Sequence, residues 1–254
     1  MNTVLYSFVV SGLAGLSTML GCFCLFFHKS NQKILVGSLS FAAGVMICVS
    51  LTDLLPNAWQ LFQNVYWYFP AFLFLALFFV VGVIFSMLID KYLPESPKES
   101  GEGHRHLYRI GLISMLAIVL HNIPEGIATF MASSADQKLG LSLALAIALH
   151  NIPEGISISS PIYYATGKKG KAFLYTLISG LSEPLGALLA FLFLSPFMND
   201  FIMAILFSFI AGIMIHIATY ELLPTSFSYQ QKRLSWIFFL IGFLFMFVSH
   251  LCFF

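Results

Sequence analysis

Six residues occur twice in this chain of 254 residues, as His-Asn-Ile-Pro-Glu-Gly from His121 to Gly126 and again from His150 to Gly155. Imidazole nitrogens, together with carboxylate and amide oxygens, are ligands that divalent transition metals accept. Both copies lie in otherwise apolar stretches, where an ionisable side chain costs roughly 2.5–3.5 kcal/mol at the centre of a bilayer. A costly pattern that is present twice therefore predicts metal binding.

The spacing inside each motif brings its polar side chains together. Residues three and four apart share one face of a helix, so the histidine and the asparagine of each copy lie beside the same glutamate. Two antiparallel helices that face each other could hold two metal ions, with Glu125 and Glu154 bridging, because a carboxylate offers two oxygens. The alternative is a plain kink at Pro124 and Pro153, with the adjoining glycines allowing close packing.

The elements that position these residues are membrane helices. The chain is 59% hydrophobic and 9% charged, with a mean hydropathy of +0.90, whereas soluble domains average about 25% charged residues. Continuous apolar runs of about 20 residues indicate helices rather than barrel strands. We expect an all-α membrane protein with one domain, 1–254, whose first apolar run is a span and not a removed signal peptide. The eight predicted spans are 4–27, 34–56, 69–90, 108–132, 139–160, 171–195, 201–226 and 235–254.

The basic residues predict the orientation of these spans. Eleven of the twelve lysines and arginines fall in loops of one parity, and Lys138 is the exception. The positive-inside rule places those loops in the cytoplasm, so both termini face outward. The net charge of +1 gives no indication of a nucleic-acid partner.

The chain also contains an inverted repeat. Spans 2 and 7 match in an acidic residue and a proline at one register, and they cross the membrane in opposite directions. The pattern predicts three spans, two central spans and three spans about a pseudo-two-fold axis, as in secondary transporters. Asp53 then lies near the outer mouth and Glu221 near the inner mouth. The stretches that match at an offset of 168 residues are 43–47 and 211–215, 53–56 and 221–224, and 11–13 and 179–181.

Buried acids without basic neighbours strengthen the prediction of a metal site. No lysine or arginine lies in the interior of a predicted span, so the buried acids are either protonated or balanced by a bound cation. Span 6 adds Glu183, followed by Pro184. The predicted metal ligands are His121, Asn122, Glu125, His150, Asn151, Glu154 and Glu183, with Asp53, His216 and Glu221 along the pathway.

The remaining histidines leave alternatives open. His216 is either a pathway ligand or a buried histidine with a satisfied hydrogen bond. His104 and His106 lie in a polar loop and either capture metal or are simply solvated. His28 and His250 are expected to be peripheral.

The doubled motif, the basic loops and the eight spans resemble the ZIP family of divalent metal transporters, and its bacterial broad-specificity branch most. The resemblance implies one metal position at His121, Glu125, His150 and Glu154. It implies a second position at Asn122, Glu125, Asn151, Glu154 and Glu183. Asp53 would lie at the entrance, Glu221 and His216 at the exit, and Met46 or Cys48 could add a sulfur ligand. The resemblance further implies uptake across the bacterial cell membrane, alternating access and a homodimer.

Three hypotheses follow. The leading one is a secondary transporter, not an enzyme, that takes up Zn2+ together with Fe2+, Cd2+ or Mn2+ and has no cofactor besides the ions it carries. The second is an intramembrane di-metal hydrolase, in which a metal-bound water attacks a substrate. The third is a slow metal channel or sensor on the same scaffold. Acids at both membrane faces favour a through-pathway over a hydrolase.

Overall fold

The computed structural model describes residues 3–27, 32–92, 102–194 and 199–253, and within these ranges it contains helices and no strand. The fold is therefore all-α, as predicted. Three short π-helical segments, η1 to η3, interrupt the α-helices. The elements are α1 (Thr3–Phe27), α2 (Gln32–Val49), η1 (Ser50–Leu54), α3 (Leu55–Val65), α4 (Tyr68–Tyr92), α5 (Glu102–Ala135), α6 (Gln137–Thr166), α7 (Lys169–Leu189), η2 (Ala190–Leu194), α8 (Asp200–His216), η3 (Ile217–Leu222), α9 (Leu223–Ser228) and α10 (Lys232–Phe253).

Seven helical stretches in the described part of the chain are long and apolar enough to cross a membrane. This confirms a multi-pass membrane protein. One of them, Gln32–Val65, joins α2, η1 and α3 into a single rod that extends well beyond the predicted span 34–56. The predicted span 139–160 falls within α6, a helix of 30 residues.

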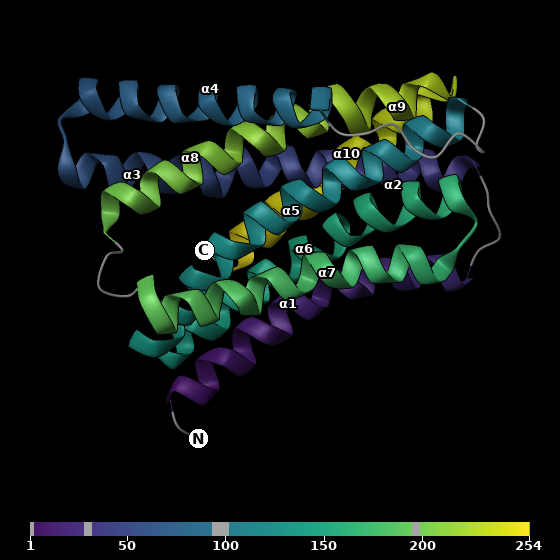
Figure 1. Cartoon of the computed structure of the whole chain (residues 1–254). Helices are drawn as coiled ribbons and strands as arrows, with labels where there is room; N and C mark the ends of the chain where they lie inside the picture. Colours follow the sequence, from purple (N-terminus) through teal and green to yellow (C-terminus); the bar gives the residue numbers. More distant parts are fainter. Residues whose placement is uncertain (1–2, 28–31, 93–101, 195–198, 254) are drawn as a thin grey trace.

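The helices pack as two bundles. Helices α1, α5, α6 and α7 contact one another extensively, and α2, α4, α8 and α10 form the second group. Figure 1 shows the first bundle below the second, with α5 and α6 at the boundary. Across that boundary α2 packs on α6 much more extensively than α8 packs on α5. The two bundles are therefore held together more tightly on one side than on the other.

The two ends of the molecule differ in charge. The α3–α4 and α5–α6 turns and the N-terminus lie at the left of Figure 1, and the starts of α2, α5, α7 and α10 lie at the right. The described helices begin or end at the right with basic residues, which are Lys33, Lys91, Arg105, Arg109, Lys169, Lys171, Lys232 and Arg233. Helix α6 begins at the left, and Lys138 lies near its start. This agrees with the prediction that Lys138 lies on the opposite side from the other basic residues.

Close approaches at glycine are repeated in the upper bundle. A Cβ at Gly44 of α2 would clash with the Phe239 carbonyl oxygen of α10, and a Cβ at Gly212 of α8 would clash with the Phe79 carbonyl oxygen of α4. The glycines differ by 168 positions and their partners by 160. Small residues let membrane helices approach closely, since packing rather than hydrophobic burial drives their association. The matched contacts relate α2 to α8 and α4 to α10.

The lower bundle has its own matched contacts. Gly15 of α1 and Gly180 of α7 each lie against the carbonyl oxygen of the other. Gly21 of α1 lies against the Ile152 carbonyl, and Gly186 of α7 lies against the Ile123 carbonyl. All these pairs relate α1 to α7 at an offset of 165. The register of 168 that the Ser-Gly-Leu match predicted is therefore wrong by three residues for these two helices.

The π-helical segments η1 and η3 are also related by the offset of 168. The Leu55 N–H donates to the Ser50 carbonyl five residues back, and the Leu223 N–H donates to the Ala218 carbonyl in the same way. Each segment is followed by a proline, which has no N–H to donate to the preceding turn. Such single π turns occur often at functional sites. They contain Asp53 and Glu221, the two acids predicted at opposite mouths.

Candidate metal centre

The duplicated motifs meet where α5 and α6 pack against each other. His121 and Glu125 of α5 and Glu154 of α6 are buried, and Glu183 of α7 is buried beside them. Gly126 fits against the carbonyl of residue 183, and Gly155 fits against the carbonyl of Thr18. The glycine of each motif thus brings α7 or α1 against the helix that carries the motif.

One histidine contacts glutamates from both motifs. His121 Nε2 lies 3.1 Å from Glu125 Oε1 and 3.6 Å from Glu154 Oε1. An imidazole nitrogen and two carboxylates from different helices therefore converge at one point. These groups belong to the first predicted metal position. The side chain of its fourth member, His150, lies outside the described residues.

The two motif asparagines are anchored through their amide nitrogens. Asn122 Nδ2 donates to the Ser179 carbonyl at 3.2 Å, and Asn151 Nδ2 donates to the Ala14 carbonyl at 3.0 Å. Asn151 Nδ2 also donates to Glu183 Oε2 at 3.1 Å. Ala14 and Ser179 again differ by 165 positions, so the repeat extends to these hydrogen bonds. The anchoring fixes where the amide oxygens point.

Three of the remaining oxygens at this level have no hydrogen-bond partner among the described atoms. They are Asn122 Oδ1, Asn151 Oδ1 and Glu183 Oε1, all buried. A buried polar atom without a partner is costly, by about 1–3 kcal/mol. Coordination to a divalent cation is one way in which such oxygens are satisfied. These residues belong to the second predicted metal position.

The side chains do not form a finished cage. Among the described residues, no three His, Cys, Asp or Glu side chains are arranged to enclose an ion. His121 instead contacts the glutamates directly. An ion that bound here would have to displace these contacts and any protons on the side chains, because metal and proton compete for the same lone pairs.

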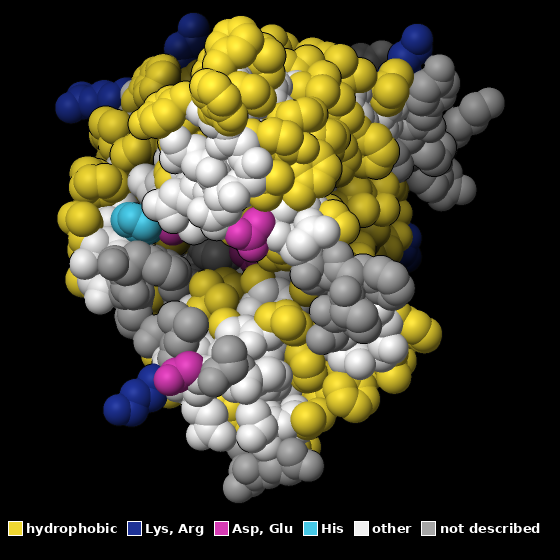
Figure 2. Space-filling model, turned by 90° about the vertical axis from the view of Figure 1, so that its left-hand side faces the viewer, with side chains coloured by type: hydrophobic (Ala, Val, Ile, Leu, Met, Phe, Trp, Pro, Cys, Tyr) yellow, Lys and Arg dark blue, Asp and Glu magenta, His cyan; other side chains and the backbone are white. Residues whose placement is uncertain are grey.

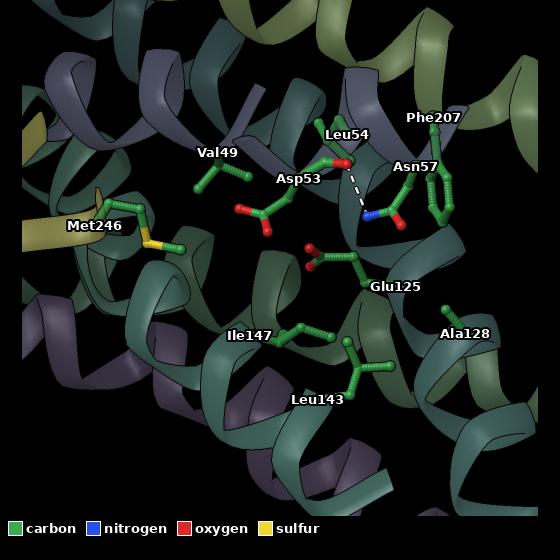
Figure 3. A pocket seen from close by; sticks show the side chains of 10 residues that line it. All are labelled: Val49, Asp53, Leu54, Asn57, Glu125, Ala128, Leu143, Ile147, Phe207 and Met246. Carbon is green, nitrogen blue, oxygen red and sulfur yellow. Dashed lines mark hydrogen bonds between the residues drawn. The ribbon is translucent and has the colours of Figure 1, made fainter. Parts of the chain in front are cut away.

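A cavity of about 80 Å³ adjoins Glu125. Figure 3 shows the carboxylates of Asp53 and Glu125 pointing toward each other across it. The volume is enough for several water molecules. Figure 2, which views the left end of Figure 1, shows a small hollow with acidic side chains at its rim. The lining residues are Val49, Asp53, Leu54, Asn57, Glu125, Ala128, Leu143, Ile147, Phe207 and Met246.

His250 was expected to be peripheral, and that expectation is wrong. Its Nδ1 lies 2.7 Å from Asp53 Oδ1. The contact links α10 to η1 across 197 positions of sequence. No local signal could have found it, because only the packing of α10 on α2 brings these residues together.

The inner pathway candidates are placed as follows. His216 Nδ1 forms a hydrogen bond of 2.9 Å with Ser86 Oγ, and its ring stacks on Tyr220 with centroids 5.0 Å apart. This is the geometry of a satisfied buried histidine, the second of the two alternatives. Glu221 is buried on η3. His106 Nε2 lies 3.2 Å from Thr225 Oγ1, which links α5 to α9.

Three further candidates remain expectations. Met46 and Cys48 are both buried in the core around α2, and neither is among the described residues that line the cavity. The side chain of His104 lies outside the described residues.

A family model described as ZIP Zinc transporter matches residues 94–250. The chain belongs to the ZIP family. It is 40% identical to a zinc transporter ZupT of Clostridium perfringens, over 100% of this chain and 98% of the relative. It is 44% identical to a zinc transporter ZupT of Lysinibacillus sphaericus over 92% of each chain, and 44% identical to one of Campylobacter jejuni over 87% of each.

Membership of the ZIP family decides between two of the hypotheses. The protein is a membrane transporter and not an intramembrane hydrolase. A transporter of this family carries divalent metal ions through a lipid bilayer, and the buried oxygens and imidazole between α5, α6 and α7 are chemically suited to such an ion.

Proposed function

We propose that this ZIP-family protein takes up Zn2+ across a bacterial cell membrane. The observation that carries the proposal is the buried set of imidazole, carboxylate and amide groups between α5, α6 and α7. Glu125 of this set lines a cavity that Asp53 also lines. The named function of the relatives agrees with this substrate. Purified protein in liposomes should take up zinc with a rate that saturates. A rate no higher than that of empty liposomes would contradict the proposal.

Two ions would bind at adjacent positions. His121, Glu125, His150 and Glu154 form the first, and Asn122, Asn151 and Glu183 share both glutamates to form the second. The three buried oxygens without hydrogen-bond partners support the second position. Nitrogen and oxygen ligands of this kind do not by themselves restrict a site to zinc, so we propose Fe2+, Cd2+ and Mn2+ as further substrates. Protonation of the ligands would aid release.

The proposed architecture has eight spans in a 3+2+3 inverted repeat within one domain. The repeated glycine contacts, at an offset that differs between pairs of related helices, and the paired π-helical segments support it. The end with the basic residues faces the cytoplasm by the positive-inside rule, and both termini face outward. A homodimer, which the family resemblance implies, remains a prediction.

Repeat-related positions differ in exposure at the two ends. Asp53 and Ala128 line the outer cavity and are partly exposed. Their counterparts, at the offset of 168 and at the offset of 29 between the two motifs, are Glu221 and Ser157, and both are buried. A carrier that alternates between two states exchanges the environments of such positions. We therefore assign this structure to an outward-open state whose inner pathway is closed.

Cysteine accessibility should distinguish this carrier from a slow channel or sensor. In a background in which the four native cysteines are serine, Ala128→Cys should react with an impermeant thiol reagent from the outside while Ser157→Cys does not. A reagent on the cytoplasmic side should reach only Ser157→Cys, and only in the inward-open state. Reaction of both cysteines at equal rates while one state is trapped would indicate a continuous pore.

A further inference from the structure

We propose that Asp53 and His250 form an outer binding site for the transported ion, which selects transition metals before they reach the central site. This inference rests on the proposed function. It assigns a binding role to His250, a residue of α10 outside both duplicated motifs. The Nδ1 to Oδ1 distance of 2.7 Å places an imidazole and a carboxylate in direct contact.

Both side chains are accessible enough to exchange ligands with a hydrated ion. The side chain of Asp53 is 17% exposed and that of His250 is 26% exposed, whereas Glu154 is fully buried. The pair therefore lies between bulk water and the buried centre. An ion that meets it needs to lose only part of its hydration shell.

Asp53 lines the cavity that adjoins Glu125, and His250 contacts Asp53 from α10. Met246, one helical turn before His250, lines that cavity. Asp53 comes from η1, where the π turn sets its direction, and Figure 3 shows its carboxylate facing Glu125. No basic residue is among the described residues that line the cavity. An ion bound at the pair could pass directly to Glu125.

Asn57 adds a further polar group at this mouth. Its Nδ2 donates to the Asp53 backbone carbonyl at 2.7 Å, and Asn57 is exposed. The bond ties the first turn of α3 to the π turn and holds the amide at the rim of the cavity. The amide oxygen of Asn57 could therefore contact an ion or its water at the pair.

The imidazole determines which ions the site prefers. A carboxylate with water and amide oxygen suits Ca2+ and Mg2+, which are far more abundant than zinc and take oxygen ligands. An imidazole nitrogen favours zinc and other transition metals over these hard ions. His250 would therefore make this mouth bind zinc in preference to Ca2+ and Mg2+, a preference that Asp53 alone would not give.

The inner mouth lacks a matching histidine at the repeat-related position. The offset of 160 between α10 and α4 relates His250 to position 90, which is an aspartate. The repeated fold thus does not need a histidine there for packing. Of these two repeat-related positions, the outer one alone carries an imidazole. This asymmetry agrees with a site that selects ions on entry.

The decisive variant is His250→Asn. An asparagine amide N–H can replace the donor that contacts Asp53 but supplies no imidazole nitrogen. In liposomes we expect the KM for zinc to rise roughly ten-fold, as when ligation is weakened at other metal sites. The rate at saturating zinc should stay near that of the unaltered protein. Millimolar Ca2+ and Mg2+ should inhibit zinc uptake by the variant much more than by the parent.

Two controls separate binding from mere positioning of Asp53. If His250 only orients Asp53, then His250→Asn preserves the KM and the weak competition by Ca2+, and the proposal is overturned. Cys252→Ala, two residues along the same helix and exposed, should match the parent in both measurements.

Equilibrium binding gives a second test that does not depend on flux. The double variant Glu125→Ala/Glu154→Ala should still bind one zinc ion, and adding His250→Asn should weaken that binding by about ten-fold. Failure of the parent to transport zinc would contradict the proposed function itself. Zinc transport by the parent with no zinc bound to the double variant would overturn only the outer site.

Discussion

Replacing Glu125 and Glu154 together with alanine should reduce zinc uptake in liposomes by at least about 100-fold. Each glutamate supplies charge to both proposed positions, and losing even a group that only supports a metal ligand costs about 10–100-fold. The two carboxylates come from different helices and lie 3.1 and 3.6 Å from His121 Nε2. Without them the site would have amides, histidines and Glu183 only. A divalent cation in a low-dielectric bundle would then lack most of its compensating charge.

The control for this experiment is Asp136→Asn. Asp136 lies in the exposed α5–α6 turn, where its Oδ1 accepts a hydrogen bond from the Lys138 N–H at 2.7 Å. An asparagine keeps that acceptor, so zinc flux should be unchanged. The single changes Glu125→Gln and Glu154→Gln, which keep shape and remove charge, should each reduce flux less than the double variant. If the double variant transports zinc at the parental rate, the assignment of the central site is wrong.

The second large effect is expected at Gly126. A Cβ at this position would clash with the Glu183 carbonyl oxygen and lie 3.1 Å from the Ala187 nitrogen, which are backbone atoms of α7. Gly126→Ala must therefore push α7 away from α5 and carry Glu183 with it. Overpacking of this kind costs about 1–3 kcal/mol. We expect a lower midpoint of thermal unfolding in detergent and weaker zinc binding.

Gly12→Ala is the matched control, because a Cβ at Gly12 meets nothing within 4 Å. Alanine is preferred over glycine in a helix by about 0.5–1 kcal/mol, so this variant should be as stable as the parent or more stable. Equal unfolding midpoints for the two alanine variants would mean that α5 and α7 do not approach as closely as described. Normal zinc binding by Gly126→Ala would mean that Glu183 is not a ligand.

Much of the fold could be predicted because the bilayer limits what a sequence can do. Apolar runs must form helices in lipid, where every backbone group needs an internal partner. The distribution of basic residues assigned the helix ends to two sides, and the described helix ends lie as that assignment requires. The offset of 168 between spans 2 and 7 is also found in the structure. There η1 and η3 repeat a π turn, an acid and a following proline at that offset.

The α1–α7 register could not be predicted in the same way. Both helices are rich in small and apolar residues, so a match of Ser-Gly-Leu at offset 168 carries little information. The offset of 165 is determined by which glycines meet which carbonyls, and this depends on how the helices cross.

By itself, the sequence indicated the kind of chemistry, which is the binding of a divalent cation. Two copies of histidine, asparagine and glutamate lie in apolar surroundings without basic neighbours. Such residues destabilise a membrane protein, so their presence indicates a function, and their types indicate cation binding. Local spacing is enough for this, since each motif places its ligands on one face of its own helix. Only the tertiary structure decided which groups meet between helices. It brought His121 to Glu154, anchored the asparagines on α1 and α7, and paired His250 with Asp53. Such contacts depend on helix crossing and register, which no local pattern encodes.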